Sequence, residues 1–152
     1  MKEIKGNIFD ITDADAICVT TNGIVKSNGE LVMGAGIAKQ FAKKWPDLPI
    51  ALGDYVTKNG NVPGVVVRTM HNKRQYIVSY PTKNHWKDSS DINLIRSSAL
   101  SLKHLADQFQ WEKVILSRPG CGLGALKWED VKAVISSILD DRFFVITPEN
   151  SK

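Results

Sequence analysis

The chain has 152 residues, of which 43% are hydrophobic, so it is long enough for one packed domain and too short for two ordinary ones. No apolar run approaches the roughly 18–20 residues of a membrane helix, and the N-terminal segment MKEIKGNIFD lacks the apolar core of a signal peptide. The net charge of +4 is mildly basic and falls short of a dedicated nucleic-acid-binding arm. We therefore expect one cytoplasmic domain over residues 1–152, with no membrane partner.

Short apolar runs alternate along the chain with helical patterns. In chain order we expect a strand at 14–20, helices at 36–45 and 48–57, strands at 64–70 and 75–81, a helix at 91–109, a strand at 113–117, a helix at 128–139 and a strand at 143–147. The polar segment HNKR, residues 71–74, is expected to be the turn between two of these strands, and Asp91 to be the N-cap of the longest helix. The alternation favours an α/β layer fold with a largely parallel or mixed sheet.

The cysteine content argues against a metal site. Cys18 and Cys121 are the two cysteines, neither stands in a C-x-x-C pair, and no cluster of cysteine and histidine has zinc spacing. A reduced compartment is the simpler interpretation, and nothing in the sequence supports a disulfide. We expect neither a metal nor a cofactor.

Two glycine-rich loops stand just before expected helices. One contains Gly34 and Gly36, and the other, which follows an expected strand, contains Gly120, Gly122 and Gly124. Ligands of open α/β sheets bind beyond the carboxyl ends of the strands. Glycines let the backbone approach a ligand and point N–H groups at it, and a helix N-terminus adds a positive dipole. The pair predicts a diphosphate site, with tight turns and helix caps as the alternative.

Basic residues gather in three short groups, KKW at 43–45, HNKR at 71–74 and TKNHWK at 82–87. They are either a solvated surface or a patch for phosphates or a polynucleotide. Aromatic side chains next to lysines, as at 82–87, suit single-stranded bases and phosphates.

The segments GNIFDI, ADAICVTTNG, VMGAGIAKQF, VSYPTKNHW and PGCGLGALKW, in this order, resemble the macrodomain family, which binds ADP-ribose. The resemblance covers residues 5–147. It implies a three-layer α/β macrodomain whose mixed central β-sheet of about six strands has helices on both faces. It also implies a ligand cleft across the strand ends, with the diphosphate between two glycine-rich loops.

PTKNHW and GCGLGAL resemble the branch of this family that has a lysine after the fourth core strand. Members of that branch remove terminal ADP-ribose from acidic side chains or, as bacterial antitoxins, from thymidine in DNA. The two motifs look more like those of the antitoxin group.

The resemblance implies a set of ligand-binding residues. They are Asn7, Ile8, Thr21, Asn22, Met33, Gly34, Ala35, Gly36, Ile37, Pro81, Thr82, Pro119, Gly120, Cys121, Gly122, Leu123, Gly124, Ala125 and Pro148. Asn7 and Ile8 match the adenine position, Asn22 the distal ribose, and Pro148 the adenine end of the cleft. Turn formation is the alternative role for Asn7 and Asn22. Cys121 matches a small packing residue rather than a nucleophile.

Three residues are implied to be catalytic: Lys83, His85 and Asn22. A lysine beside an anomeric carbon can attack the opened ribose aldehyde as an amine and form a Schiff base. It can also act only as a cation that favours the leaving group. His85 has the intrinsic pKa for acid–base work near neutral pH. The alternatives are an exposed loop lysine and a loop histidine packed beside Trp86.

The chain departs from the family pattern at two places. The branch that acts on protein carboxylates has an aspartate in the second loop, where this chain has Gly124 and Ala125. The first loop also carries an insertion, in which Lys26, Asn28 and Glu30 are expected to project near the ribose end of the cleft. The insertion either shapes the mouth of the cleft or is a neutral turn.

These observations lead to one functional hypothesis and two alternatives. The leading hypothesis is an ADP-ribosyl hydrolase that releases ADP-ribose from nucleic acid, thymidine in DNA above all, with Lys83 as the catalytic residue. One alternative is a phosphatase acting on ADP-ribose 1''-phosphate, and the other is a non-catalytic ADP-ribose reader. The expected partners are ADP-ribose or an ADP-ribosylated substrate and single-stranded DNA, bound by a monomer.

Overall fold

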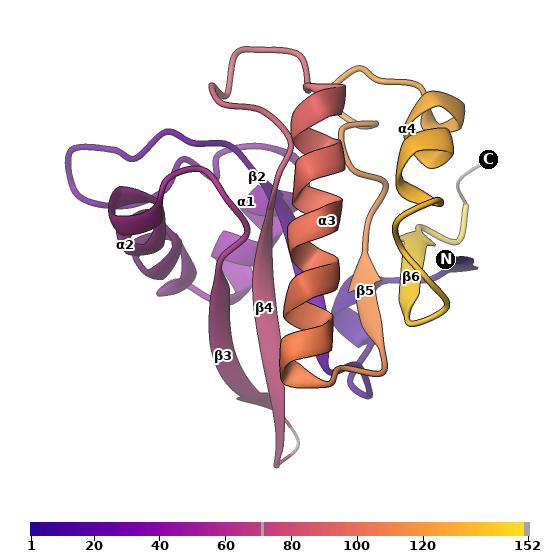
Figure 1. Ribbon diagram of the computed structural model, residues 1–152. Coiled ribbons are helices and arrows are strands. Elements are labelled where there is room, and N and C mark those ends of the chain that lie inside the picture. The colour runs from indigo at the N-terminus through magenta and orange to yellow at the C-terminus, as the bar shows by residue number, and fades with distance from the viewer. Residues whose placement is uncertain (71, 151–152) are drawn as a thin grey trace.

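The computed structural model describes residues 1–70 and 72–150 (Figure 1). Within these ranges the elements are β1 (Lys2–Lys5), the 3-10 helix η1 (Ile8–Asp10), β2 (Ala16–Thr21), α1 (Gly36–Lys44), α2 (Leu48–Asn59), β3 (Val65–Met70), β4 (Lys73–Pro81), α3 (Ile92–Phe109), β5 (Val114–Leu116), α4 (Trp128–Ile135) and β6 (Phe143–Thr147). Every strand and helix expected from the sequence is present.

Most boundaries agree with the sequence-based expectation to within two residues, and the differences at β1, β4 and α4 have a physical reason or change an assignment. β1 was not expected, because its four residues KEIK have no apolar run and three of them are exposed. Lys73 and Arg74 belong to β4 rather than to a turn, and the first residue of HNKR, His71, lies outside the described residues. α4 ends at Ile135, four residues before the expected end at 139.

The six strands form one mixed sheet in the order β1-β6-β5-β2-β4-β3. Every neighbouring pair is parallel except β3 with β4, which pair antiparallel. The parallel strands therefore end at one edge of the sheet, at the top of Figure 1, where the loops before α3 and α4 also lie. Because β2 lies between β4 and β5, the loops that follow these three strands are neighbours.

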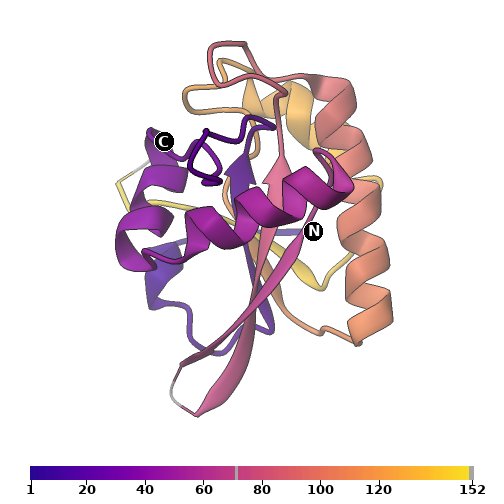
Figure 2. The ribbon, with the colours of Figure 1, turned by 90° about the vertical axis from the view of Figure 1, so that its left-hand side faces the viewer.

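Helices cover both faces of the sheet, as the two views show (Figures 1 and 2). Ala16 and Cys18 of β2 join the cluster that contains side chains of α3 and α4, whereas Ile17 and Val19 join the cluster that contains side chains of α1 and α2. The alternation follows from the two-residue period of a strand. The three-layer α/β architecture expected from the sequence, a mixed sheet of six strands with helices on both faces, is confirmed.

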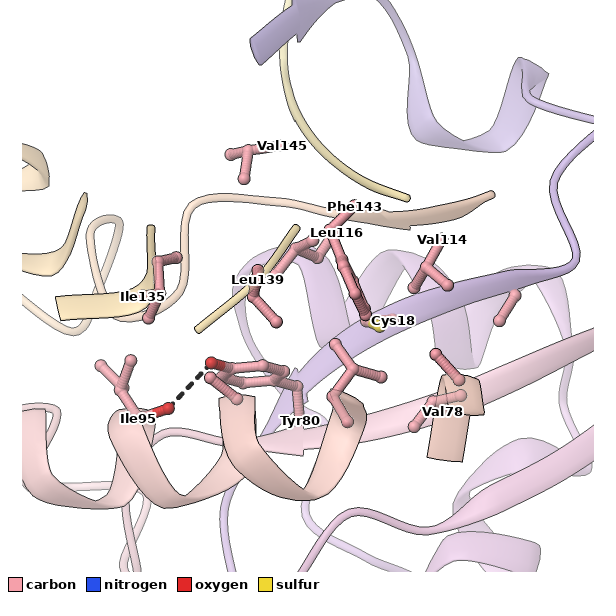
Figure 3. Packing of buried hydrophobic residues seen from close by; sticks show 14 of the residues in the cluster. Cys18, Val78, Tyr80, Ile95, Val114, Leu116, Ile135, Leu139, Phe143 and Val145 are labelled. Atoms are coloured by element: carbon pink, nitrogen blue, oxygen red, sulfur yellow. Dashed lines mark hydrogen bonds between the residues drawn. The ribbon is translucent and has the colours of Figure 1, made fainter. Parts of the chain in front are cut away.

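Tyr80, near the end of β4, holds the first turn of α3 against the strand (Figure 3). Its ring is fully buried, and its hydroxyl donates a 2.8 Å hydrogen bond to the carbonyl of Ile95, the fourth residue of α3. Ser98 Oγ donates to Pro81 O at 2.8 Å from the same helix. Both bonds hold the helix against the strand end, so the loop between them leaves from two fixed points.

Asp91 caps α3 as expected. Its carboxylate accepts from the backbone N–H groups of Asn93 at 2.8 Å and Leu94 at 3.4 Å. Its own N–H donates to Thr82 O at 2.8 Å, which closes the loop of residues 82–91 at its base.

Glu3 connects β1 to α4 and to the loop after β5. Its carboxylate accepts hydrogen bonds from Lys132 Nζ at 2.6 Å and Trp128 Nε1 at 2.9 Å, and the Arg118 guanidinium lies 3.9 Å away. The hydrogen bond from Lys132 is the largest cause, and that from Trp128 the next, of a pKa of Glu3 below its usual 4.5.

We expect Glu3→Gln to reduce the free energy of unfolding by less than about 1 kcal/mol at neutral pH, because these contacts are partly exposed. The folded-state pKa of Glu3 is lowered, so its contribution is present above pH 4.5 and is lost as pH falls through the folded-state value. Urea unfolding of both proteins at a series of pH values measures this. Glu149→Gln, at an exposed carboxylate after β6, is the matched control. A stability difference that stays constant down to pH 3 would contradict the assignment.

Candidate functional site

A cleft of about 860 Å³ opens at the carboxyl ends of the parallel strands. The expected binding residues that line it are Asn22, Met33, Gly34, Ala35, Gly36, Ile37, Thr82, Lys83, Gly120, Gly122, Leu123, Gly124 and Pro148. It is also lined by Thr20, Val32, Ala38, Gln40, Trp86, Lys87, Asp88, Ser90, Ser117 and Arg118. Of these, only Trp86 and Lys87 had been considered as binding residues, as part of the possible polynucleotide patch at 82–87. The two glycine-rich loops therefore share one cleft.

The glycine-rich loops face each other across this cleft. A Cβ added to Gly36 would lie 3.5 Å from Leu123 Cδ1 of the second loop. Gly36 has a φ of +60° and Gly120 a φ of +76°, which favour glycine, and a Cβ on Gly120 would also lie 2.7 Å from Ile95 Cδ1. Both turns need glycine for conformational reasons, and both also present bare backbone to the cleft.

The helix dipole expected behind each loop is present behind one of them. α1 begins at Gly36, and its N-cap residue Ala35 makes no side-chain capping bond, so the N–H groups of its first turn stand at the cleft wall. The second loop differs, because α4 begins only at Trp128, four residues after Gly124. The second loop can offer its backbone N–H groups but not a helix N-terminus.

Lys83 stands on the cleft wall in a backbone held from three directions. Thr82 N donates to Thr21 O at 3.0 Å, Asn61 Nδ2 donates to Lys83 O at 3.1 Å, and Gly23 N donates to Asn84 O at 3.0 Å. Asn61 Nδ2 also lies 3.0 Å from Asn84 Oδ1. Lys83 is half-buried, and within residues 1–70 and 72–150 its Nζ has no hydrogen-bond or ion-pair partner. The backbone is fixed and the ammonium is available.

Asn22 lines the cleft and also makes the turn that was its alternative role. Its Nδ2 donates to Val32 O at 3.0 Å, and its Oδ1 accepts from Ile24 N at 3.0 Å. One amide hydrogen and one oxygen lone pair remain for a ligand. Asn22 therefore closes the base of the insertion while it faces the cleft.

The loop after Lys83 presents an aromatic pair. The rings of His85 and Trp86 lie 5.3 Å apart, and His85 Nδ1 accepts from Lys87 N at 3.1 Å. Trp86 and Lys87 line the cleft, whereas His85 is outside its lining. This arrangement matches the alternative role of His85, a loop histidine packed beside Trp86, and its catalytic role stays a prediction.

Comparison with known proteins identifies the family of this fold. A model of the Macro domain family matches residues 26–135. The chain belongs to the Macro domain family. Its sequence is 30% identical over 124 residues to the DNA ADP-ribosyl glycohydrolase of Mycobacterium tuberculosis, a match that covers 79% of this chain and 33% of that protein. The chain thus spans about a third of the length of this curated relative.

Two further comparisons agree. The macrodomain is 28% identical over 138 residues to the ADP-ribose glycohydrolase OARD1 of Bos taurus, which covers 90% of this chain and 82% of that protein. It superposes on the macrodomain of Mycobacterium tuberculosis DarG with a TM-score of 0.81 and 27% identity, over 98% of both chains.

Several expected residues of the macrodomain site lie outside the cleft lining. They are Asn7, Ile8, Thr21, Pro81, Pro119, Cys121 and Ala125, in addition to His85. Asn7 is the N-cap of η1 and accepts from Phe9 N at 2.9 Å, which is its turn-forming alternative. Ile8 is buried in the core on the α1 and α2 side. Their adenine-binding role stays a prediction.

Cys121 is a packing residue with an unreactive thiol. Its Sγ donates to Pro119 O at 3.4 Å, and it packs against the core on the α3 and α4 side. Burial is the largest influence and raises the pKa of this thiol to about 11. The thiol is therefore protonated near neutral pH and is a poor nucleophile.

The tip of the insertion lies away from the cleft, contrary to expectation, although its last two residues, Val32 and Met33, line it. Lys26, Asn28 and Glu30 are absent from the cleft lining and contact one another instead. Asn28 Nδ2 donates to Glu30 Oε1 at 2.7 Å, and Lys26 pairs with Glu30 at 3.7 Å. Leu31 then enters the core and its N–H donates to Pro49 O at 2.9 Å. The segment is the tight turn that the sequence offered as the alternative.

Arg118 and Asp88 are charged cleft residues that the sequence reading missed. The Arg118 guanidinium lies 5.1 Å from the centre of the Trp128 ring, and Arg118 lines the cleft. Asp88 supplies the one carboxylate among the lining residues and follows directly after Lys87. The available signal for Arg118 was its position as the one basic residue between β5 and the second loop's first glycine.

Two searches of the described residues gave negative results. No group of three or more His, Cys, Asp or Glu side chains could hold a metal ion within 1–70 and 72–150. No helix in those same ranges is long and apolar enough to cross a membrane.

We expect Asn61→Ala to loosen the Lys83 backbone, because it removes the donor to Lys83 O and to Asn84 Oδ1. The free energy of unfolding should fall by about 1–3 kcal/mol, the cost of leaving such a group unpaired. Hydrogen exchange at the Gly23 N–H, which donates to Asn84 O, should accelerate. Asn59→Ala, which removes an exposed bond to Tyr55 O in the same region, is the control. Unchanged exchange at Gly23 would show that the loop is held without Asn61.

Proposed function

We propose that this macrodomain hydrolyses the bond between ADP-ribose and a carrier, and that the carrier is a thymidine base of DNA. The observation that carries the proposal is Lys83, whose unpaired ammonium stands in the wall of a cleft between two glycine-rich loops. The glycohydrolase names of the mycobacterial and bovine relatives support it.

The cleft suits ADP-ribose in shape and charge. Its volume of about 860 Å³ is within the range of small-molecule sites. The backbone around Gly34–Gly36 can bind one phosphate and that of Gly120–Gly124 the other. Lys83, Lys87 and Arg118 outnumber Asp88 along the lining, which favours a doubly charged diphosphate.

The orientation of the ligand follows from the two ends of the cleft. Asn22 follows β2 and Lys83 follows β4, whereas Ser117 and Arg118 follow β5 and Pro148 follows β6. The strand order β6-β5-β2-β4 therefore puts Asn22 and Lys83, an amide and an amine for the distal ribose, at one end and the adenosine at the other. With this orientation the bond to the carrier lies beside Lys83.

Lys83 can cleave that bond in two ways. As an amine, it adds to C1'' of the opened distal ribose, the bond from C1'' to the carrier breaks, and the carrier takes up a proton. Water then hydrolyses the resulting imine, which releases ADP-ribose and returns the lysine. As a cation, Lys83 instead stabilises the negative charge of the leaving base while water attacks C1''.

DNA is favoured over a protein carboxylate because of the second loop. Gly124 and Ala125 stand where the protein-directed branch has an aspartate, so a lysine–aspartate pair is not available there. The phosphatase alternative relied on His85 or a bound water, and His85 is outside the cleft lining. Monomeric state and a location in the cytoplasm remain part of the proposal.

We expect Gly34→Val to weaken ADP-ribose binding at least about tenfold, a loss of about 1.4 kcal/mol. A Cβ added to Gly34 meets no protein atom within 4 Å, so the side chain should enter the cleft without straining the fold. Calorimetry with ADP-ribose measures the affinity, and thermal unfolding should stay close to wild type. Ala133→Val, on the exposed face of α4, is the control. Unchanged affinity would remove the first loop from the binding site.

We expect Lys83→Ala to lower turnover by about 10²-fold or more, the effect of losing one catalytic group, while much of the ADP-ribose affinity remains. Wild type and variant are assayed on thymidine-ADP-ribosylated single-stranded DNA, an ADP-ribosylated acidic protein and ADP-ribose 1''-phosphate. Lys39→Ala, an exposed lysine of α1, should keep full activity. Binding by wild type without turnover on any substrate would make the protein a reader.

Borohydride separates the two roles of Lys83. Reduction during turnover traps an imine as a stable ADP-ribosyl adduct, which peptide mass spectrometry would locate at Lys83. A lysine that acts only as a cation leaves no adduct although turnover continues.

A further inference from the structure

We propose that Trp86 is a stacking platform for the base next to the modified thymidine in a single-stranded DNA carrier, and that Lys87 contacts the DNA backbone. The inference rests on the proposed function, because it places the carrier by the bond beside Lys83. It adds a DNA-binding surface within the lining of the same cleft.

The exposure of Trp86 distinguishes it from the other tryptophans. Its side chain is 48% exposed, whereas Trp111 is buried and Trp45 and Trp128 are half-buried. A large ring in water loses the stabilisation that burial would give it. The fold gains little from Trp86 in this position, and a binding partner would gain much.

The position of Trp86 is at the mouth of the cleft. Trp86 and Lys87 line the cleft together with Lys83, three residues earlier in the chain. A carrier attached to the distal ribose leaves the cleft beside Lys83. Trp86 is the one aromatic side chain among the described lining residues, so it is the ring on which a base next to the thymidine can stack.

The loop holds Trp86 in place. Asp91 N donates to Thr82 O at 2.8 Å at the base of the loop, and Asp88 N donates to His85 O at 3.0 Å around the tryptophan. The His85 ring packs against the Trp86 ring at 5.3 Å with an interplanar angle of 31°. A platform ordered before binding loses little conformational entropy when the base arrives.

Charge next to the ring favours a nucleic acid over a peptide. Lys87 Nζ lies 5.2 Å from the centre of the Trp86 ring, so a cation and a π-face occur together. Single-stranded nucleic acids present the matching pair of a flat base and a phosphate at every nucleotide. An acidic peptide would use the lysine but would leave the exposed ring without a partner.

The experiment compares Trp86→Ala, Trp86→Phe and wild type in binding an unmodified oligothymidine, measured by fluorescence anisotropy. Loss of one stacked base should weaken binding about 5- to 150-fold in the alanine variant, and the phenylalanine variant should recover part of the loss. Leu100→Ala, which truncates a side chain of α3 that is also 48% exposed, should bind like wild type. Equal binding by wild type and Trp86→Ala would overturn the proposal.

Lys87→Ala gives a separate measurement. Loss of one phosphate contact should reduce the slope of log Kd against log salt concentration by about 0.7 for a single strand. An unchanged slope would remove Lys87 from the proposed surface.

Turnover measurements test whether Trp86 contacts the base next to the modified thymidine. In Trp86→Ala, kcat/KM should fall much more on a modified oligonucleotide than on ADP-ribosylated thymidine nucleoside, which has no neighbouring base. Equal losses on both would overturn the assignment to the neighbouring base. A third outcome separates the two proposals. If wild type does not turn over modified DNA but Trp86→Ala still loses oligothymidine binding, the DNA-binding surface is supported and the proposed function fails.

Discussion

The pairing of β2 with parallel strands on both sides is the constraint on which the cleft depends. β2 lies between β4 and β5, and its register places Thr21 beside Pro81. Parallel strands bring their carboxyl ends to one edge, so residues that are widely separated in sequence become neighbours there. Thr82 N bonds to Thr21 O and extends this pairing by one residue, to the position just before Lys83. The lysine and the first glycine-rich loop owe their proximity to this pairing.

Much of the fold could be predicted because the spacing of hydrophobic residues shows which strands and helices are buried against the two faces of the sheet. β2, with five of six residues buried, and α3, with apolar positions three and four residues apart, gave strong signals. β1 gave none, because an edge strand with exposed side chains has no apolar pattern to detect. The end of α4 was predicted too late because hydrophobic residues continue at helical spacing past Ile135, whereas the helix itself ends there.

The glycine-rich loops and Lys83 were also predictable, since glycine requirements and motif order are local properties of the sequence. The cleft residues that were missed, such as Ser90 and Arg118, depend on loops that meet only in the folded chain. The insertion around Asn28 was misplaced for the same reason. Its polar side chains Asn28 and Glu30 hydrogen-bond to each other, and its Leu31 packs in the core. Neither interaction brings Asn28 or Glu30 to the cleft. Tertiary contacts decided these positions, and no short pattern encodes them.

The single antiparallel strand of the sheet has a consequence for how the site is encoded. Because β3 runs opposite to β4, the residue that precedes β3 returns to the edge where β4 ends, and Asn61 meets Lys83. A parallel strand of six residues in that place would put Asn61 roughly 20 Å away, at the other edge of the sheet. The β3–β4 hairpin thus brings Lys83 and Asn61, whose side chain donates to the Lys83 carbonyl, together at one edge of the sheet. Because the two strands pair residue by residue, adding one residue to each of them would leave Asn61 and Lys83 at the same edge, so their proximity does not depend on the length of the hairpin.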